Sequence, residues 1–183
     1  MSDIKIRQAV KADAEAIAKI HIAGWRSSYG GLVEQDYLDE LSIEEKSSDW
    51  SKWLSEDTVQ VLMAETGDGT ACGFSGFGKL RTPIPGMSPI RPLYTGELYA
   101  LYIMEEFWRQ GIGTKLMGKT ARVLLDMKHK SMSLWVLKKN KRAVSFYKDM
   151  GGQRCGKKPT TIGNTELLDV AFGWRDTTAL RAL

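Results

Sequence analysis

Apolar residues recur along this chain at two spacings, and these spacings predict short strands separated by helices. Ile4 and Ile6 alternate with polar residues, as do Val59, Val61 and Met63, and such alternation is typical of half-buried strands. After the short strand at the start, we predict strands over residues 58–65, 71–80, 97–103, 132–136, 153–157 and 166–174.

Helical spacing dominates between these segments. Ala16, Ile17, Ile20 and Gly24 recur three to four residues apart, so they share one helix face. Near the end, Asn140 is a favourable N-cap residue and Gly151 a favourable residue just past a helix C-terminus. We therefore predict helices through Gly24, around 35–41, briefly at 50–54, after the turn at 111–113, and over 140–150.

The order of these elements, β-α-α-β-β-β-α-β-α-β-β, predicts an α/β sheet with helices packed on its faces. We expect one domain spanning residues 1–183. In the strand at 97–103, strict alternation predicts two faces. One face carries Glu97, Tyr99, Leu101 and Ile103, and the other carries Leu98, Ala100 and Tyr102.

A proline-rich segment at 81–95 interrupts the strands. It holds four of the five prolines in the chain. Long loops inside a compact chain are usually functional or disordered. Because the strands on both sides are short and need one another to bury a face, we interpret the segment as a loop within the domain.

Composition excludes several classes of protein. Of 183 residues, 43% are hydrophobic and 26% are charged, and no apolar run is long enough to cross a membrane. The first ten residues carry charges at Asp3, Lys5 and Arg7, which is not the pattern of a signal peptide. The net charge of +4 suits an anionic ligand, although a mildly basic surface explains it equally well.

The few soft ligands argue against a metal centre. Cys72 and Cys155 lie far apart in the sequence, and His21 and His129 are the only histidines. This set fits neither a zinc site nor a disulfide framework. We expect two reduced thiols in a cytoplasmic protein without a bound metal.

The segment at 110–114 carries the first chemical signal. Gly111 and Gly113 stand where a helix is predicted to begin. Free N–H groups at a helix start, together with the helix dipole, form an anion site. A pyrophosphate is the natural occupant, but two spaced glycines are weak evidence by themselves because glycines also serve ordinary turns.

Two longer sequence segments make this glycine signal specific. The first is Leu101-Tyr102-Ile103 followed by Phe107-Trp108-Arg109-Gln110-Gly111-Ile112-Gly113-Thr114-Lys115-Leu116, and the second is Asn140-Lys141-Arg142-Ala143-Val144-Ser145-Phe146-Tyr147-Lys148-Asp149-Met150-Gly151-Gly152. In this order and separation they resemble the acetyl-CoA signature and the "N-x-x-A-x-x-F-Y-x-x-x-G-F" segment of the GNAT family of N-acetyltransferases. The family pattern has Arg or Gln where this chain has Trp108.

The resemblance implies the GNAT fold, a mixed and mostly antiparallel sheet of six to seven strands with helices on both faces. It also implies acetyl-CoA as co-substrate, with direct transfer to an amine in a ternary complex. Backbone groups of Leu101 and Ile103 would hold the pantetheine arm, and Asn140 would touch it or act as an N-cap. The pyrophosphate would lie against Gln110, Gly111, Gly113 and Thr114.

The resemblance assigns catalytic roles as well. Tyr147 matches the general acid that protonates the leaving thiolate, and its alternative role is a core tyrosine. Glu97 is the candidate base that removes the proton of the acceptor ammonium, and its alternative is an edge position beside solvent. Trp25 and Tyr29 resemble an aromatic pair that lines the acceptor site, with ordinary core packing as the alternative.

The sequence also allows other functions. The string Gly113–Thr120 matches the nucleotide-binding pattern G-x-x-x-x-G-K-[ST], but the preceding strand ends about ten positions too early and the string falls inside a predicted helix. A second alternative is a module that binds acyl-CoA without transferring the acyl group. Gly73–Phe77 lacks the last glycine of a serine-hydrolase elbow.

The sequence does not name the acceptor, which we expect to be a small molecule or peptide with a free amine. We expect no nucleic-acid or membrane partner, because no recognition motif or apolar span is present. A homodimer is the commonest assembly for such a chain.

Overall fold

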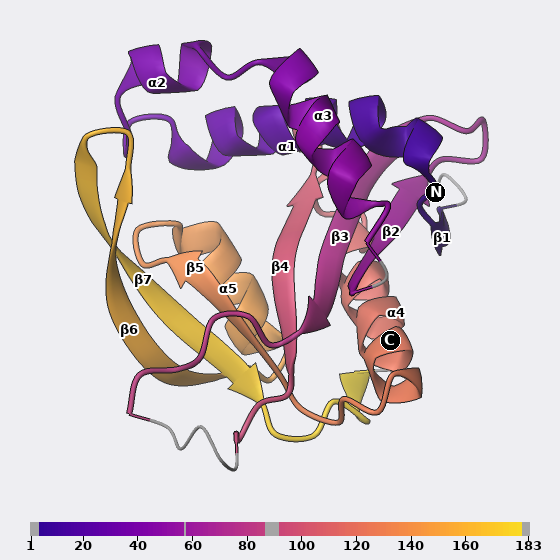
Figure 1. Ribbon diagram of the computed structural model, residues 1–183, viewed down its shortest axis with the longest axis vertical. Coiled ribbons are helices and arrows are strands. Elements are labelled where there is room, and N and C mark those ends of the chain that lie inside the picture. The colour runs from indigo at the N-terminus through magenta and orange to yellow at the C-terminus, as the bar shows by residue number, and fades with distance from the viewer. Residues whose placement is uncertain (1–3, 57, 87–91, 181–183) are drawn as a thin grey trace.

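The chain folds around one sheet, which Figure 1 shows in the computed structural model; the structure describes residues 4–56, 58–86 and 92–180. Within these residues the sheet has seven strands in the order β1-β2-β3-β4-β5-β7-β6. Only the β4–β5 pair is parallel, so the sheet is mixed and mostly antiparallel, as predicted. The strands are β1 (Lys5–Gln8), β2 (Val59–Glu65), β3 (Ala71–Lys79), β4 (Gly96–Ile103), β5 (Met132–Leu137), β6 (Gln153–Ile162) and β7 (Thr165–Trp174).

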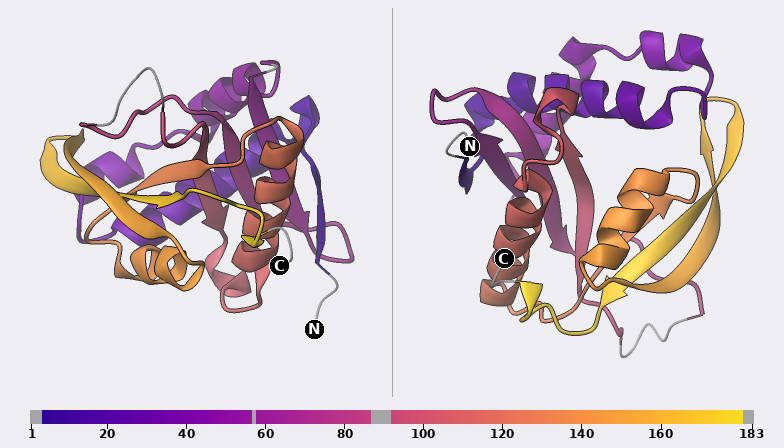
Figure 2. Two further views of the ribbon diagram at one scale, coloured as in Figure 1. Left: turned by 90° about the horizontal axis from the view of Figure 1, so that it is seen from below. Right: turned by 180° about the vertical axis from the view of Figure 1, so that it is seen from behind.

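Helices cover both faces of the sheet. The α-helices are α1 (Ala14–Tyr29), α2 (Gln35–Asp39), α3 (Ile43–Trp53), α4 (Ile112–Asp126) and α5 (Lys141–Asp149), with 3-10 turns η1 (Lys11–Asp13) and η2 (Glu105–Phe107). Figure 2 shows α4 and α5 on one face and α1 with its neighbours toward the other. We call these the α4–α5 face and the α1 face.

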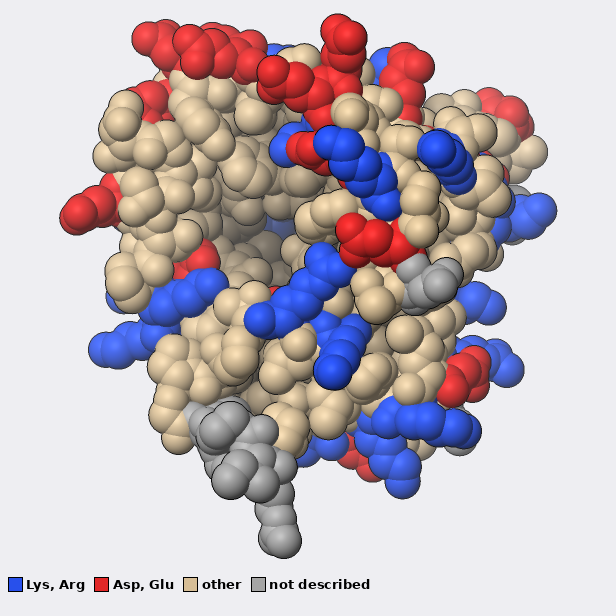
Figure 3. All heavy atoms as spheres, in the orientation of Figure 1, with Lys and Arg blue, Asp and Glu red and all other residues tan. Residues whose placement is uncertain are grey.

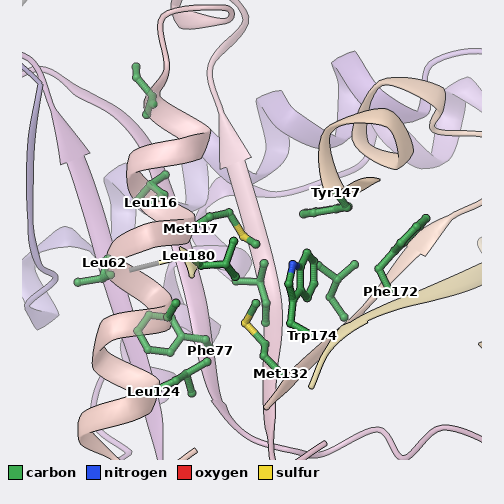
Figure 4. Packing of buried hydrophobic residues seen from close by; sticks show 14 of the residues in the cluster. Leu62, Phe77, Leu116, Met117, Leu124, Met132, Tyr147, Phe172, Trp174 and Leu180 are labelled. Carbon is green, nitrogen blue, oxygen red and sulfur yellow. The ribbon is translucent and has the colours of Figure 1, made fainter. Parts of the chain in front are cut away.

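Each face buries its own apolar cluster. On the α4–α5 face, the helix stripe predicted from the sequence supplies Leu116 and Leu124, which pack on Phe77 and Leu134 from the sheet. Figure 4 shows this cluster, with Tyr147 reaching it from α5. On the α1 face, Ile17 and Ile20 pack with Phe74 and Trp50. Burial of these two clusters fixes which side of the sheet each helix occupies.

The sheet divides between β4 and β5. Their parallel pairing joins Gly96–Leu98 to Met132–Leu134 and ends there. Among the described residues, the rest of β4 pairs with β3 alone, up to Ile103. The C-terminal half of β4 therefore faces β5 across a gap rather than across a ladder of hydrogen bonds.

A bulge in β4 corrects the face assignment that strict alternation predicts. The β3–β4 register pairs Gly76 with Ala100 and Phe77 with Leu98, so Tyr99 is the extra residue. Leu98 consequently joins Leu101 and Ile103 in the cluster on the α4–α5 face. Tyr99, Ala100 and Tyr102 lie instead on the α1 face.

Several elements are longer than the sequence pattern predicts, among them α1, which continues to Tyr29 rather than ending near Gly24. The helix α3 begins at Ile43, because the Ser42 hydroxyl accepts a hydrogen bond from the Glu45 N–H at 3.2 Å and caps its first turn. Strands β6 and β7 pair up to Ile162 and Thr165, with one shift of register between Arg154 and Gly156. Their hairpin reaches the start of α2, where the Thr165 hydroxyl donates to a Glu34 carboxylate oxygen at 2.7 Å.

A glycine lets α1 approach the sheet closely. A Cβ at Gly24 would lie 2.4 Å from a ring carbon of Tyr102, which no real contact tolerates. The helix can therefore press directly against the Tyr102 ring in β4. This contact places the C-terminal end of α1 beside the gap between β4 and β5.

Candidate functional site

A cavity of about 770 Å³ passes through the gap between β4 and β5. From the α4–α5 face it is lined by Leu101, Ile103 and Phe146 among others, and from the α1 face by Tyr29 and Tyr102. Figure 3 shows its opening on the α1 face as a hollow below α1 and α2. Residues from both faces of the sheet therefore share one cavity.

Most of the residues predicted to hold the cofactor lie in this cavity. The lining includes Leu101, Ile103, Gly111, Gly113, Thr114 and Asn140. The Gln110 side chain does not line it and donates to the Glu106 carbonyl at 3.2 Å. Asn140 caps α5, because its side-chain oxygen accepts from the Ala143 N–H at 3.1 Å. Its predicted contact with the cofactor stays a prediction.

The start of α4 has the geometry of an anion site. Gly111 is its N-cap residue and has a φ of 78°, a left-handed conformation that glycine adopts without steric cost. The first N–H groups of a helix have no intrahelical acceptor, and here the N-cap residue has no side chain to bind them. A Cβ added at Gly111 would meet nothing within 4 Å, so the N-cap opens onto free space.

Contacts with two other residues hold the Trp108 side chain in place, and the sequence does not predict them. Its indole N–H donates to the Ile103 carbonyl at 2.8 Å, and Arg142 stacks on the ring with Cζ 3.3 Å from the ring centroid. Arg142 also donates to the Ser28 hydroxyl at 3.4 Å. These contacts join α1, the loop before α4 and the start of α5 along the cavity wall.

Three tyrosines meet inside the cavity. The Tyr29 and Tyr102 hydroxyls lie 3.4 Å apart, and Tyr147 is close enough to interact electrostatically with both. Burial raises the pKa of each phenol above its usual value, because the charged phenolate loses its hydration. All three therefore carry their protons at neutral pH and can donate hydrogen bonds.

The predicted base Glu97 lies apart from this cluster. Its carboxylate accepts the backbone N–H groups of Arg81 and Thr82, each at 2.7 Å, and its side chain does not line the cavity. These bonds hold the start of the loop after β3 against β4. The position is buried, with 5% of the residue exposed, rather than beside solvent. Its role as a base stays a prediction.

The contacts of Glu97 predict a stability effect. Both N–H groups donate to the same carboxylate oxygen, Oε2, and Glu97→Gln removes the charge that strengthens both bonds, so we expect the free energy of unfolding to fall by about 1–3 kcal/mol. Denaturant unfolding monitored by tryptophan fluorescence measures this change. If the variant keeps its stability but loses turnover, Glu97 acts in catalysis rather than in holding the loop.

Trp25 and Tyr29 have different positions although the sequence pairs them. Tyr29 lines the cavity, whereas Trp25 lies behind it, packed edge-on against Tyr29 and His21 with centroids 5.1 and 5.7 Å apart. His21 accepts a hydrogen bond from the Trp50 indole at 3.1 Å, and burial, followed by the nearby Lys46 charge, lowers its pKa to about 4. It is therefore a neutral member of an aromatic cluster.

Sequence reasoning missed several cavity residues. Tyr99, Tyr102 and Trp135 line it from the two sides of the gap. Tyr102 stood inside the quoted motif, and alternation correctly placed it with Ala100 on the face opposite Leu101 and Ile103, but the pattern did not indicate that this face lines a cavity. No pattern along the chain indicates that Trp135 faces the same space.

The structure contradicts two of the alternatives, the nucleotide-binding loop and the serine-hydrolase elbow. The segment from Gly113 to Thr120 lies entirely within α4, so it cannot form a nucleotide-binding loop. Ser75 is buried and bonded to the Thr120 hydroxyl at 2.9 Å, so it is no exposed nucleophile. The described residues contain no group of three metal-ligating side chains and no helix that is long and apolar enough to cross a membrane.

Comparisons with known proteins agree with this geometry. A model of the acetyltransferase (GNAT) family matches residues 22–151. An uncharacterized N-acetyltransferase, YuaI of Bacillus subtilis, is 34% identical over 98% of each chain, and one of Archaeoglobus fulgidus is 32% identical over 79% of this chain and 89% of its own.

Solved structures share the fold. An N-acetyltransferase (PaiA) from Thermoplasma acidophilum in complex with coenzyme A has a TM-score of 0.70 and 21% identity, covering 93% of this chain and 98% of its own. A putative acetyltransferase (yncA) from Salmonella typhimurium, with its cofactor acetyl-CoA, has a TM-score of 0.69 and 19% identity over 94% of each chain.

Proposed function

The chain belongs to the acetyltransferase (GNAT) family, and on that premise we propose that it transfers the acetyl group of acetyl-CoA directly to the amine of an acceptor, in the cytoplasm. The observation that carries the proposal is the cavity between β4 and β5, which is lined by residues from both faces of the sheet and lies beside the uncapped start of α4. The overall reaction converts an ammonium and a thioester into an amide, a thiol and a released proton.

The α4–α5 face supplies the residues for the nucleotide side. Acetyl-CoA supplies an activated acyl group and two negatively charged phosphate groups in its diphosphate. The uncapped N–H groups at the start of α4 are suited to that diphosphate, and Gly111 leaves space for it. Backbone groups of β4 beyond Leu98 are free of β5 and can bind an extended arm along the gap.

The reacting groups meet where the three tyrosines gather. In our proposal the Tyr147 hydroxyl protonates the thiolate as it leaves, since burial keeps that hydroxyl protonated at neutral pH. The Ile103 N–H polarises the thioester carbonyl. Tyr29 lies on the acceptor side of Tyr147, where it contacts Tyr102.

Ligand-induced stabilisation tests the proposal. Acetyl-CoA at 100 times its dissociation constant should stabilise the folded state by about 2.7 kcal/mol and raise the melting temperature by several degrees. ATP with magnesium should give no comparable shift at the same concentration. Stabilisation by ATP alone would contradict the acetyltransferase assignment and favour a nucleotide-binding protein.

A further inference from the structure

Two aromatic side chains flank the point where β4 and β5 separate. The strands pair as far as Leu98 and Leu134, and the next residues are Tyr99 on β4 and Trp135 on β5. Tyr99 packs on the α1 face. Trp135 points to the same face, because its neighbours Leu134 and Val136 pack on the α4–α5 face. Both rings are half-buried and line the cavity, so they form two walls where the gap begins.

The bulge in β4 turns the Tyr99 ring toward the tyrosine cluster. Tyr99 and Tyr102 are three residues apart, so strict alternation would put them on opposite faces. The bulge at Tyr99 brings both to the α1 face. Tyr99 therefore shares the cavity with the Tyr102 and Tyr29 hydroxyls, about 10 Å away along the strand at the rise of extended chain.

One short segment anchors both rings. The Tyr99 hydroxyl donates to the Lys79 carbonyl at 2.5 Å. The Trp135 indole N–H donates to the Thr82 carbonyl at 3.3 Å. Residues 79–82 therefore fix the two rings relative to each other, so a ligand does not have to order them when it binds.

Further contacts hold this segment and the two rings in place. The Glu97 carboxylate accepts two backbone N–H groups of the segment, as described above. The Arg81 guanidinium stacks on Tyr99 with Cζ 4.5 Å from the ring centroid, and the Lys158 ammonium lies 4.6 Å from the centroid of Trp135. Neither cation lines the cavity, so each supports its ring from outside.

The α1-face lining is uncharged among the residues that the structure describes. The charged side chains that line the cavity belong to the loop before α4 and to α5, and they are Arg109, Lys141, Arg142 and Asp149. The α1 face thus offers no carboxylate to a second ammonium group on the acceptor, and the cations behind the two rings would repel one. It offers aromatic faces, which favour contact with another flat ring.

We propose that the acceptor is a primary amine with a single cationic group and an aromatic body, and that this body lies against the Tyr99 and Trp135 rings. The inference rests on the proposed function, because it names the acceptor class for the same cavity. With its ring at the point where the strands separate, the acceptor extends its amine along β4 toward the three tyrosine hydroxyls, where the proposed transfer occurs.

Matched acceptors test the aromatic body. Thiol release from acetyl-CoA is followed with 2-phenylethylamine, 3-phenylpropylamine and tryptamine, with the saturated analogues 2-cyclohexylethylamine and 3-cyclohexylpropylamine, and with putrescine and spermidine. Values of kcat/KM are calculated per free amine, because the members of a pair differ in basicity. We expect at least one phenyl compound to exceed its cyclohexyl analogue, and both polyamines, by about tenfold or more, since only a flat ring stacks on the two walls.

Variants assign the preference to the two walls. Trp135→Leu and Tyr99→Leu keep an apolar side chain but remove the ring, so each should reduce the phenyl-to-cyclohexyl ratio of kcat/KM about fivefold. The KM for acetyl-CoA should stay near the parent value. Tyr37→Leu is the matched control, because Tyr37 is a half-buried aromatic residue beside Tyr29 that does not line the cavity, and it should change neither quantity.

The outcomes separate the two proposals. If acetyl-CoA neither stabilises the parent protein nor supports thiol release, the acetyltransferase proposal fails. If acetyl-CoA stabilises the protein but the cyclohexyl compounds or the polyamines equal the phenyl compounds, or none of the amines is acetylated, only the aromatic-acceptor inference is overturned. A phenyl preference that survives in both Leu variants also overturns it. Stabilisation by acetyl-CoA shows that a variant is folded, and if either variant does not fold, the comparison of acceptors in the parent protein decides.

Discussion

Replacing Tyr147 with phenylalanine should lower turnover by roughly 10²–10⁴-fold with any amine that the protein acetylates. The change removes one hydroxyl and keeps the ring, which packs against Phe146, Phe172 and Trp174. A general acid at this position contributes about 3–5 kcal/mol of transition-state stabilisation, because the thiolate is a charged leaving group. Steady-state kinetics with thiol detection measure the loss.

Two further measurements distinguish catalysis from packing in this variant. The dissociation constant of acetyl-CoA and the melting temperature should stay close to the parent values. Tyr94→Phe is a matched control, because Tyr94 is equally buried but does not line the cavity, and its turnover should change little. Turnover of Tyr147→Phe within about twofold of the parent would remove Tyr147 as the acid.

Gly111→Glu should weaken acetyl-CoA binding by about 100-fold or more. The new carboxylate would project from the N-cap of α4 into the space that we assign to the diphosphate, where like charges repel. Calorimetric titration with acetyl-CoA measures the affinity. Far-ultraviolet circular dichroism should show an intact fold.

The backbone conformation requires a control in this experiment, because Gly111 has a φ of 78°. A non-glycine residue in this conformation costs about 1–3 kcal/mol of stability, whatever its charge. Gly111→Gln has nearly the same side-chain shape and backbone cost as Gly111→Glu, but it adds no charge. Equal losses of affinity in both variants would attribute the effect to strain and would contradict the diphosphate site.

Much of the fold could be predicted from local patterns. The strands β2 and β3, the stripe of α4 and the N-cap at Asn140 depend on residues close together in the chain, so spacing alone identifies them. The pattern failed where a long-range contact overrides local preference. In β4, the register against β3 inserts a bulge at Tyr99 and moves Leu98 to the other face.

By itself, the sequence determined the family, the order of the elements and the residues of the two cofactor motifs. These features are local, because an N–H cradle at a helix start and a tyrosine on a helix face need only a short segment with the right spacing. Only the tertiary structure decided which of the chemically capable residues share the cavity. It placed Glu97 under backbone N–H groups, whereas Tyr29, Tyr102 and Tyr147 meet from α1, β4 and α5. The sequence could not predict which residues share the cavity, because the cavity lies in the gap between β4 and β5. That gap arises from strand pairing and helix packing over many residues and leaves no periodic signal in the chain.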